Sequence, residues 1–316
     1  MVAALAAVYL VWGSTYLGIA IALEGLPPFL LGAFRFGLAA LIMVPLVLRW
    51  TGLRPDRQLW RAALVTGALM PFAGNGAVIL AERRAPSGLV ALIIATVPLW
   101  MVLLDWLRPG GRRPGLLEAF GLLGGLVGIA LLVDPGATLG NAGVPLFETA
   151  ILMAGGIAWA AGSLHSRNAA PGSAVPMLAA LQMVVAAGLF FTVAVARGEL
   201  SGFSPAAVGL RSWLAIGYLA AIGSVIAYSA YVWLMRATTP SLAASYAYVN
   251  PVVALALGAL FAGEVITGRV VLASVILLGA VVVLSVAARQ RVRPVISPAL
   301  AAPVPGGPPD DPRRVA

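Results

Sequence analysis

Apolar residues dominate the chain and fall into long runs, which short segments rich in arginine, proline and glycine separate. A helix needs about 20 residues to cross a hydrocarbon core roughly 30 Å thick, and most of the runs approach that length. In lipid, every backbone polar group has to be satisfied within the segment, which favours helices. The pattern therefore predicts an all-α membrane protein with ten transmembrane helices. They lie at residues 3–23, 28–48, 60–81, 87–107, 116–133, 146–165, 174–196, 212–235, 241–263 and 268–288.

The second half of this pattern repeats the first. Trp12 and Trp159 lie 147 residues apart, and further along the spacing becomes 153. At that second spacing three pairs match: Trp60 with Trp213, Arg83 with Arg236, and Pro98 with Pro251. Each unit holds five spans, an odd number, so the two units insert with opposite orientation. Such inverted repeats are typical of secondary transporters, which bind substrate near the membrane midplane between the units.

The repeats divide the chain into three parts. We predict a first five-helix repeat at residues 1–134, a second, inverted repeat at 145–288, and a tail at 289–316. The tail is rich in proline and has almost no periodic apolar content, so we expect it to be disordered. The first apolar run lacks a basic start and exceeds the core of a signal peptide, so we expect it to remain as a span.

Arginines are distributed unevenly between the two predicted sides of the membrane. Fourteen lie after even-numbered spans or in the tail, at positions 49, 54, 57, 61, 108, 112, 113, 167, 236, 289, 291, 293, 313 and 314. Five lie on the opposite side, at positions 83, 84, 197, 211 and 269. Because short cytoplasmic loops carry an excess of positive charge, this bias predicts that both termini are cytoplasmic.

The rest of the composition excludes several classes of chemistry. The chain has no cysteine, no lysine and a single histidine, His165. This excludes disulfides, thiolate nucleophiles and catalytic lysines, and it leaves no histidine cluster for a metal. The net charge of +9 comes from arginines in loops and the tail, which indicates membrane orientation rather than nucleic-acid binding. We expect no catalytic residue, metal or cofactor. The expected partners are the lipid bilayer and a small-molecule substrate, and the expected state is a monomer or weak homodimer.

Polar residues inside the spans are the candidates for function. Arg35 lies in the second span, where a buried arginine costs at least about 2.5 kcal/mol and needs a partner or water. One interpretation is that Arg35 binds an anion or gates access to a cavity. The other is that it forms an ion pair with Glu82 or Glu24. Asn75 lies between two glycines in the third span, so either a ligand or a neighbouring helix can approach its amide closely.

Two prolines lie inside predicted spans at matching places of the two repeats. Pro98 and Pro251 each remove a backbone hydrogen bond and are expected to bend their helices. Thr96 and Asn250 lie close to them and can bond the freed carbonyls. Matching bends in two repeats favour a binding and hinge region. The alternative is a static kink that improves packing.

Aromatic residues gather near those prolines, together with Tyr228 and Tyr231 of the eighth span. They either line a cavity for amphipathic or cationic solutes or anchor the helices at the interface. The candidate substrate-binding residues are Trp12, Arg35, Asn75, Trp100, Trp159, Tyr246, Tyr248 and Asn250. The candidate coupling and gating residues are Glu82, Pro98 and Pro251, with Glu82 as the carboxylate that would titrate in proton antiport.

Several short stretches, in this order, resemble the EamA family of the drug/metabolite transporter superfamily. They are Trp12-Gly13-Ser14-Thr15-Tyr16, Pro27-Pro28-Phe29, Arg35-Phe36, Gly74-Asn75-Gly76, Ala81-Glu82, Pro86-Ser87-Gly88, Ala95-Thr96-Val97-Pro98-Leu99 and Ser245-Tyr246-Ala247-Tyr248-Val249-Asn250-Pro251-Val252-Val253. Similar proteins often carry a histidine after the Ala-Glu pair, where this chain has Arg83.

The resemblance implies ten helices around a central cavity in the bacterial inner membrane. The implied activity is export of small metabolites or drugs by alternating access, with proton coupling open. An uptake permease or uniporter on the same fold is the first alternative. A non-transport membrane scaffold is a remote one, and nothing in the motifs implies an enzyme.

Overall fold

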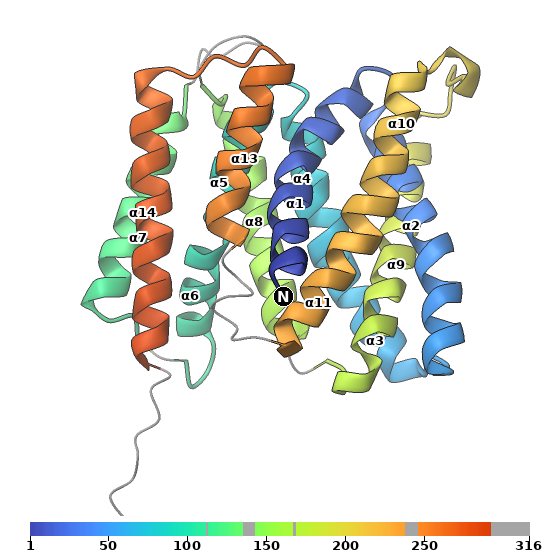
Figure 1. The fold of residues 1–316 in the computed structure, drawn as a ribbon, viewed down its shortest axis with the longest axis horizontal. Coiled ribbons are helices and arrows are strands. Elements are labelled where there is room, and N and C mark those ends of the chain that lie inside the picture. Colours follow the sequence, from blue (N-terminus) through green and yellow to red (C-terminus); the bar gives the residue numbers. More distant parts are fainter. Residues whose placement is uncertain (112, 135–142, 167–168, 238–245, 292–316) are drawn as a thin grey trace, which may run out of the picture.

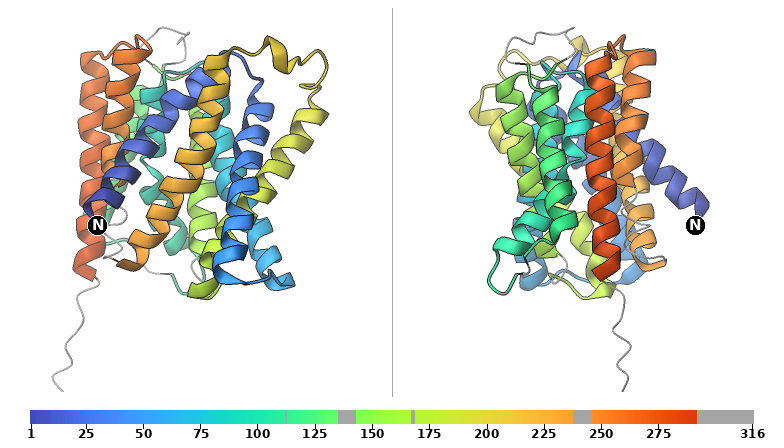
Figure 2. Two further views of the ribbon diagram at one scale, coloured as in Figure 1. Left: turned by 45° about the vertical axis from the view of Figure 1, so that its right-hand side comes forward. Right: turned by 90° about the vertical axis from the view of Figure 1, so that its left-hand side faces the viewer.

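The computed structural model describes residues 1–111, 113–134, 143–166, 169–237 and 246–291. In this part of the chain it is a bundle of helices whose axes run roughly along one direction (Figures 1 and 2). The first half comprises α1 (Val2–Leu23), α2 (Pro28–Thr51), α3 (Arg57–Gly67), η1 (Ala68–Gly74), α4 (Asn75–Ala81), α5 (Ser87–Ile94), α6 (Val97–Leu107) and α7 (Leu116–Leu132). The second half comprises α8 (Leu146–Ser166), η2 (Gly172–Ala174), α9 (Val175–Ala196), η3 (Pro205–Ala207), α10 (Leu210–Tyr218), η4 (Leu219–Ile226), α11 (Ala227–Ala237), α13 (Tyr246–Phe261) and α14 (Gly268–Arg291).

Among the described residues, eight helices are long and apolar enough to cross a membrane. Two further apolar helices, Leu116–Leu132 and Val249–Phe261, are shorter and coincide with the fifth and ninth predicted spans. The predicted all-α class is therefore confirmed, and its helices lie where the hydrophobic runs placed them. The last helix continues to Arg291, past the predicted end of the second repeat. The remainder of the predicted tail lies outside the described residues.

Local sequence signals set several helix ends. Proline occupies the first position of α2, where its missing N–H would have no helical partner. The same helix ends at Gly52, which adopts a left-handed conformation with φ 61°. Asp56 caps α3, because its carboxylate accepts a hydrogen bond of 2.7 Å from the backbone N–H of Leu59.

At Pro98 the fourth span is interrupted just before the proline, and no single helix continues through it. Helix α5 ends at Ile94, and α6 begins at Val97 with Pro98 in its first turn. Proline fits the start of a helix better than its interior, and the hydroxyl of Thr96 bonds the carbonyl oxygen of Ile93 at 2.5 Å. In contrast, α13 continues through Pro251.

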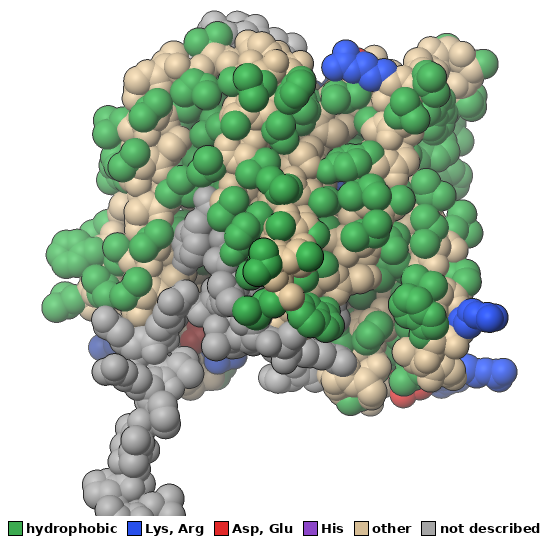
Figure 3. All heavy atoms as spheres, viewed as in Figure 1, with side chains coloured by type: hydrophobic (Ala, Val, Ile, Leu, Met, Phe, Trp, Pro, Cys, Tyr) green, Lys and Arg blue, Asp and Glu red, His purple; other side chains and the backbone are tan. Residues whose placement is uncertain are grey.

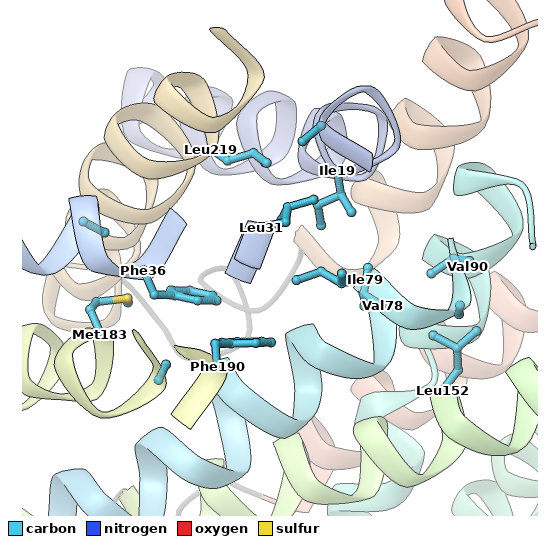
Figure 4. Close-up of a cluster of buried hydrophobic side chains, with 14 of the residues drawn as sticks. Ile19, Leu31, Phe36, Val78, Ile79, Val90, Leu152, Met183, Phe190 and Leu219 are labelled. Carbon is cyan, nitrogen blue, oxygen red and sulfur yellow. The ribbon is translucent and has the colours of Figure 1, made fainter. Parts of the chain in front are cut away.

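The best-packed part of the core lies between α2 and α9. The rings of Phe36 and Phe190 are stacked, with centroids 5.6 Å apart and an interplanar angle of 13° (Figure 4). Gly32 makes this approach possible, because a side chain there would overlap the ring of Phe190. This close pair fixes the second and seventh spans against each other, on the side of the bundle away from α7 and α14 (Figure 1).

The outer surface of the bundle is apolar. Leu41 and Leu260 are 74% and 75% exposed, and similar side chains cover much of the face in Figure 3. The arginines visible in that view lie near the upper and lower ends of the molecule. Such a surface is unstable in water but suits contact with lipid, which agrees with helices of membrane-spanning length.

Candidate functional site

Two π-helical turns interrupt the helices of the third and eighth spans. They are η1, Ala68–Gly74, and η4, Leu219–Ile226. Pro71 lies inside η1 and cannot donate the helical hydrogen bond there. In η4, the indole of Trp12 donates to the carbonyl of Gly223, and the hydroxyl of Ser224 donates to that of Leu219. Turns of this kind are rare and are frequently found at functional sites.

Arg35 of α2 lies between these two turns. Its side chain is 5% exposed, and its Nε donates to the hydroxyl oxygen of Ser224 in η4 at 3.2 Å. Its Nη1 donates to the amide oxygen of Asn75 at 3.3 Å, directly after η1. The guanidinium carbon also lies 4.9 Å from the ring centroid of Phe36. The buried Arg35 thus forms hydrogen bonds with both the third and the eighth spans. The structure brings the candidates Arg35 and Asn75 together.

The acidic partners considered for Arg35 are engaged differently. Among the ion pairs of the described residues, Glu24 pairs with Arg211 at 3.5 Å, and no pair joins Arg35 to a carboxylate. The ion-pair alternative for Arg35 is therefore wrong in this structure. The two hydrogen bonds of the guanidinium go instead to neutral oxygens, those of Ser224 and Asn75.

Glu82 lies at the end of α4, close to where α1 ends and α2 begins. It is 7% exposed, and neither carboxylate oxygen has a hydrogen-bond partner among the described residues. Burial raises its pKa well above the ordinary value, the nearby Glu264 raises it further, and Arg35 lowers it. Glu82 also lines a cavity of about 460 Å³, together with Glu24 and Arg83. The arrangement places a buried carboxyl group, without a hydrogen-bond partner in the described structure, at the wall of a cavity.

A second cavity, of about 310 Å³, shares Pro27, Pro28 and Arg83 with the first. Glu199, from the segment after α9, lines it and accepts hydrogen bonds of 2.9 Å from the N–H groups of Phe29 and Leu30. This carboxylate caps the start of α2 from a position 170 residues away in the sequence. No local pattern around Glu199 predicts that contact.

Glu264 makes a similar connection at the start of α5. Its carboxylate accepts hydrogen bonds from the N–H and hydroxyl of Ser87, at 2.5 and 2.6 Å, and from the N–H of Gly88 at 3.0 Å. A side chain at Gly258 would collide with this carboxylate, and one at Gly88 would collide with Leu255 and press on the carboxylate, so both glycines shape the niche that holds it. Glu264 lies near the end of a predicted span, and its position alone does not indicate this contact, which reaches 177 residues along the chain.

The aromatic candidates divide between two places. Trp12 contacts Tyr246 and Tyr231, with ring centroids 4.9 and 5.2 Å away, and lies 6.5 Å from Tyr228. These rings pack on one another between α1, α11 and α13. Asn250 lies on the same side of the bundle and is 8% exposed. In the amide orientation that satisfies it, its nitrogen donates to the carbonyls of Tyr9 and Tyr246, while the Tyr248 side chain lies outside the described part.

Trp100 and Trp159 lie apart from these rings, and each packs against a glycine. The ring of Trp159 lies against Gly74 at the end of η1, where it leaves no room for a side chain. Trp100 lies beside Gly156 of α8, and its buried indole nitrogen has no hydrogen-bond partner in the described structure. Such a donor can bond a ligand without displacing an existing partner.

A helical bundle with a lipid-facing apolar surface and a polar centre defines a multi-pass membrane protein of the transporter class. The chain belongs to the EamA-like transporter family, whose model matches residues 1–134 and 147–286. It is therefore classed with transporters rather than with enzymes. The resemblance seen in the short motifs is confirmed.

Relatives of known name agree with this assignment. The chain is 38% identical over 302 residues to YedA of Escherichia coli K12, an "uncharacterized inner membrane transporter", and 94% of each chain is covered. It is 29% identical over 254 residues to protein PecM of Dickeya dadantii, which covers 79% of this chain and 80% of that one. It is 24% identical over 263 residues to a "probable amino-acid metabolite efflux pump" of Escherichia coli K12, with 81% and 85% covered.

A crystal structure of another protein shares the fold. Its TM-score is 0.61 at 22% sequence identity, and the match covers 92% of this chain and 97% of that chain. Together with the apolar helices and the inner membrane relative, this supports a multi-pass inner membrane protein.

Proposed function

We propose that this transporter exports small metabolites or drugs across the cytoplasmic membrane by alternating access. In this proposal ten transmembrane helices form two inverted repeats, residues 1–134 and 145–288, around a central substrate path. Both termini lie in the cytoplasm, and the cavities beside Glu82 open to the outside. The repeat spacing in the sequence and the distribution of arginines support this arrangement.

The contacts of two tryptophans support the repeat. Trp12, in the first half, donates to the carbonyl of Gly223 in η4 of the second half at 3.1 Å. Trp159, in the second half, packs on Gly74 in η1 of the first half. The tryptophans lie 147 residues apart and the glycines 149 apart, so each half places an indole on the π-helical turn of the other. Equivalent exchanged contacts are what a two-fold relation between the halves predicts.

The observation that carries the proposal is the buried guanidinium of Arg35 between the two π-helical turns. The hydrogen bonds of the described residues use its Nε and Nη1, and arginine has further donors that a polar or anionic group can accept. A change of access that separates η1 from η4 would break these two long bonds and free the guanidinium for substrate. We place the substrate path along the previously named aromatic and amide side chains: Trp12, Asn75, Trp100, Trp159, Tyr246, Tyr248 and Asn250.

Glu82 is the residue that we assign to proton coupling. Its carboxyl group is buried and unpartnered, and it lines a cavity. Because burial raises its pKa, the group binds a proton readily and releases it when the surroundings become more polar. Such a group can exchange one proton for one substrate during each cycle.

The direction of transport rests on the relatives. One of them is named as an efflux pump for amino-acid metabolites, and this supports export of small polar or amphipathic solutes. Uptake on the same fold remains the alternative function, since an alternating-access carrier can run in either direction along a gradient.

The test is flux through oriented vesicles that contain the purified protein. Solutes that raise its melting temperature are loaded on one side, and exchange is measured with and without a proton gradient. We expect uphill export that an inward proton gradient drives in the wild type. Glu82→Gln mimics the protonated carboxyl and should retain solute exchange but lose the response to the gradient. Equal gradient dependence in both proteins would contradict the coupling role of Glu82.

A further inference from the structure

The spacing of the repeat relates a second buried polar pair to Arg35 and Asn75. Gln182 of α9 lies 147 residues after Arg35, which is the spacing that relates the two tryptophans. Tyr228 of α11 lies 153 residues after Asn75, which is the spacing of the later matches. These two residues are in contact, because the hydroxyl of Tyr228 donates to the amide oxygen of Gln182 at 3.2 Å. In each half, a polar residue of the second long helix therefore bonds to a residue just after the π-helical turn, the first residue in one half and the second in the other.

Arg35 and Gln182 each make a second hydrogen bond, to a residue in the other half of the chain. Gln182 is 3% exposed, and its amide nitrogen donates to the hydroxyl of Thr66 at 2.8 Å, just before η1. Thr66 in turn donates to the carbonyl of Ala62 at 2.7 Å. Arg35 makes the corresponding crossing to Ser224 in η4. Both residues thus tie the third span to the eighth, one from α2 and one from α9.

We infer that Gln182 is a positioning residue for transport. It holds the ring of Tyr228 in the aromatic group that Tyr228 forms with Trp12, Tyr231 and Tyr246. This inference rests on the proposed function. Tyr228 lies 6.5 Å from Trp12 and 6.2 Å from Tyr231, so its orientation sets one side of that group. Its hydroxyl has an acceptor in Gln182, whose amide oxygen accepts from Tyr228 while its amide nitrogen donates to Thr66. A buried network with every member satisfied fixes a single arrangement of its side chains.

Gln182 differs from its counterpart in a way that matters for function. Arg35 brings a positive charge and further N–H donors, whereas the amide of Gln182 is neutral and both its nitrogen and its oxygen bond to protein side chains. The two halves therefore present unlike groups at equivalent places. Gln182 acts on substrate through Tyr228 rather than by touching it.

The test compares variants that remove the hydrogen bond between Gln182 and Tyr228 from either side. Gln182→Met keeps the shape of the side chain and removes both amide contacts, while Tyr228→Phe removes only the hydroxyl. Loss of one neutral hydrogen bond corresponds to roughly a three- to tenfold change in an equilibrium constant. We expect either variant to raise KM for vesicle flux by that factor, with the turnover rate within about twofold. The double variant should be no worse than Gln182→Met alone, because both substitutions remove the same contact between Gln182 and Tyr228.

Two further variants separate positioning from general stability. Gln182→Glu retains an acceptor for the Tyr228 hydroxyl and should keep KM within about twofold of the wild type. Thr192→Val removes a hydroxyl from the exposed face of the same helix and should change neither KM nor melting temperature. A Gln182→Met protein with a lower melting temperature but an unchanged KM would overturn the inference.

A second measurement does not depend on transport. In protein labelled with 3-fluorotyrosine, the ¹⁹F resonance of Tyr228 is assigned by its loss in Tyr228→Phe. Gln182→Met should shift or broaden that resonance, whereas Thr192→Val should leave it in place. An unchanged resonance in Gln182→Met overturns the inference even if flux falls. Wild-type vesicles that exchange no stabilising solute would overturn the proposed function, and with it the transport role of Gln182, whatever the resonance shows.

Discussion

Replacement of Glu264 by glutamine should destabilise the bundle more than any other loss of a single charge at that end of the molecule. The carboxylate accepts three hydrogen bonds from Ser87 and Gly88 at the start of α5. Glutamine retains one acceptor oxygen, but its NH₂ group faces a backbone N–H and cannot accept from it. The variant also removes a negative charge from a helix N-terminus.

The magnitude follows from these two losses. A hydrogen bond to a charged acceptor contributes about 1.5–3 kcal/mol, and the charge at the helix start about 0.3–1 kcal/mol. We therefore expect Glu264→Gln to lower the free energy of unfolding by about 2–4 kcal/mol. Gly258→Ala should reproduce much of this loss, because the added methyl group would displace the carboxylate from its niche.

The assay is equilibrium unfolding in mixed detergent micelles, with wild type and variants at one pH. Glu24→Gln is the matched control at the same end of the bundle. That side chain is half exposed and pairs with an exposed Arg211 at 3.5 Å, so its loss should cost less than about 1 kcal/mol. If Glu264→Gln proves no less stable than Glu24→Gln, the carboxylate does not fasten α5 and the reasoning is refuted.

Three other predictions follow from the site and the topology. Arg35→Gln should lose at least tenfold in transport while the protein still inserts and purifies normally, and failure to accumulate in the membrane would make Arg35 a structural residue only. Pro251→Ala restores a hydrogen bond inside α13 and should slow flux while solute affinity stays within about tenfold, or ~1.4 kcal/mol. Pro98→Ala should have the smaller effect, since that proline begins a helix, and normal flux in both variants would exclude a hinge. A reporter that is active only outside the cytoplasm should be silent when fused after Ala288, and a strong signal would contradict the orientation.

The helices could be predicted from sequence because length and hydrophobicity are local properties. Arg35 and Asn75 could be singled out for the same reason, since a polar residue inside an apolar run is visible without a structure. The contact of Glu264 with Ser87 spans 177 residues, and the sequence around either residue gives no sign of it. The break before Pro98 also escaped prediction, because a proline inside a long apolar run is compatible with a bend or with two helices.

The network around Gln182 shows a different limit. The spacing of 147 was visible from the tryptophans, and extending it from Arg35 leads to Gln182. Arginine is charged and glutamine is neutral, however, so the residue types alone do not relate Arg35 to Gln182. The structure relates them, because both side chains form hydrogen bonds with the third and eighth spans.

The π-helical turn η1 determines which way the end of the third span faces. An α-helix advances about 100° around its axis with each residue, and a π-helical turn accommodates one additional residue. Thr66 lies before η1 and faces Gln182, whereas Asn75 lies after it and faces Arg35. If one residue were deleted from η1, the regular helix would close and Asn75 would rotate by about 100° away from Arg35. The additional residue therefore rotates the end of the third span, so that this span can bond to both α9 and α2. The number of residues in η1 is then as important for these contacts as the identities of Thr66 and Asn75.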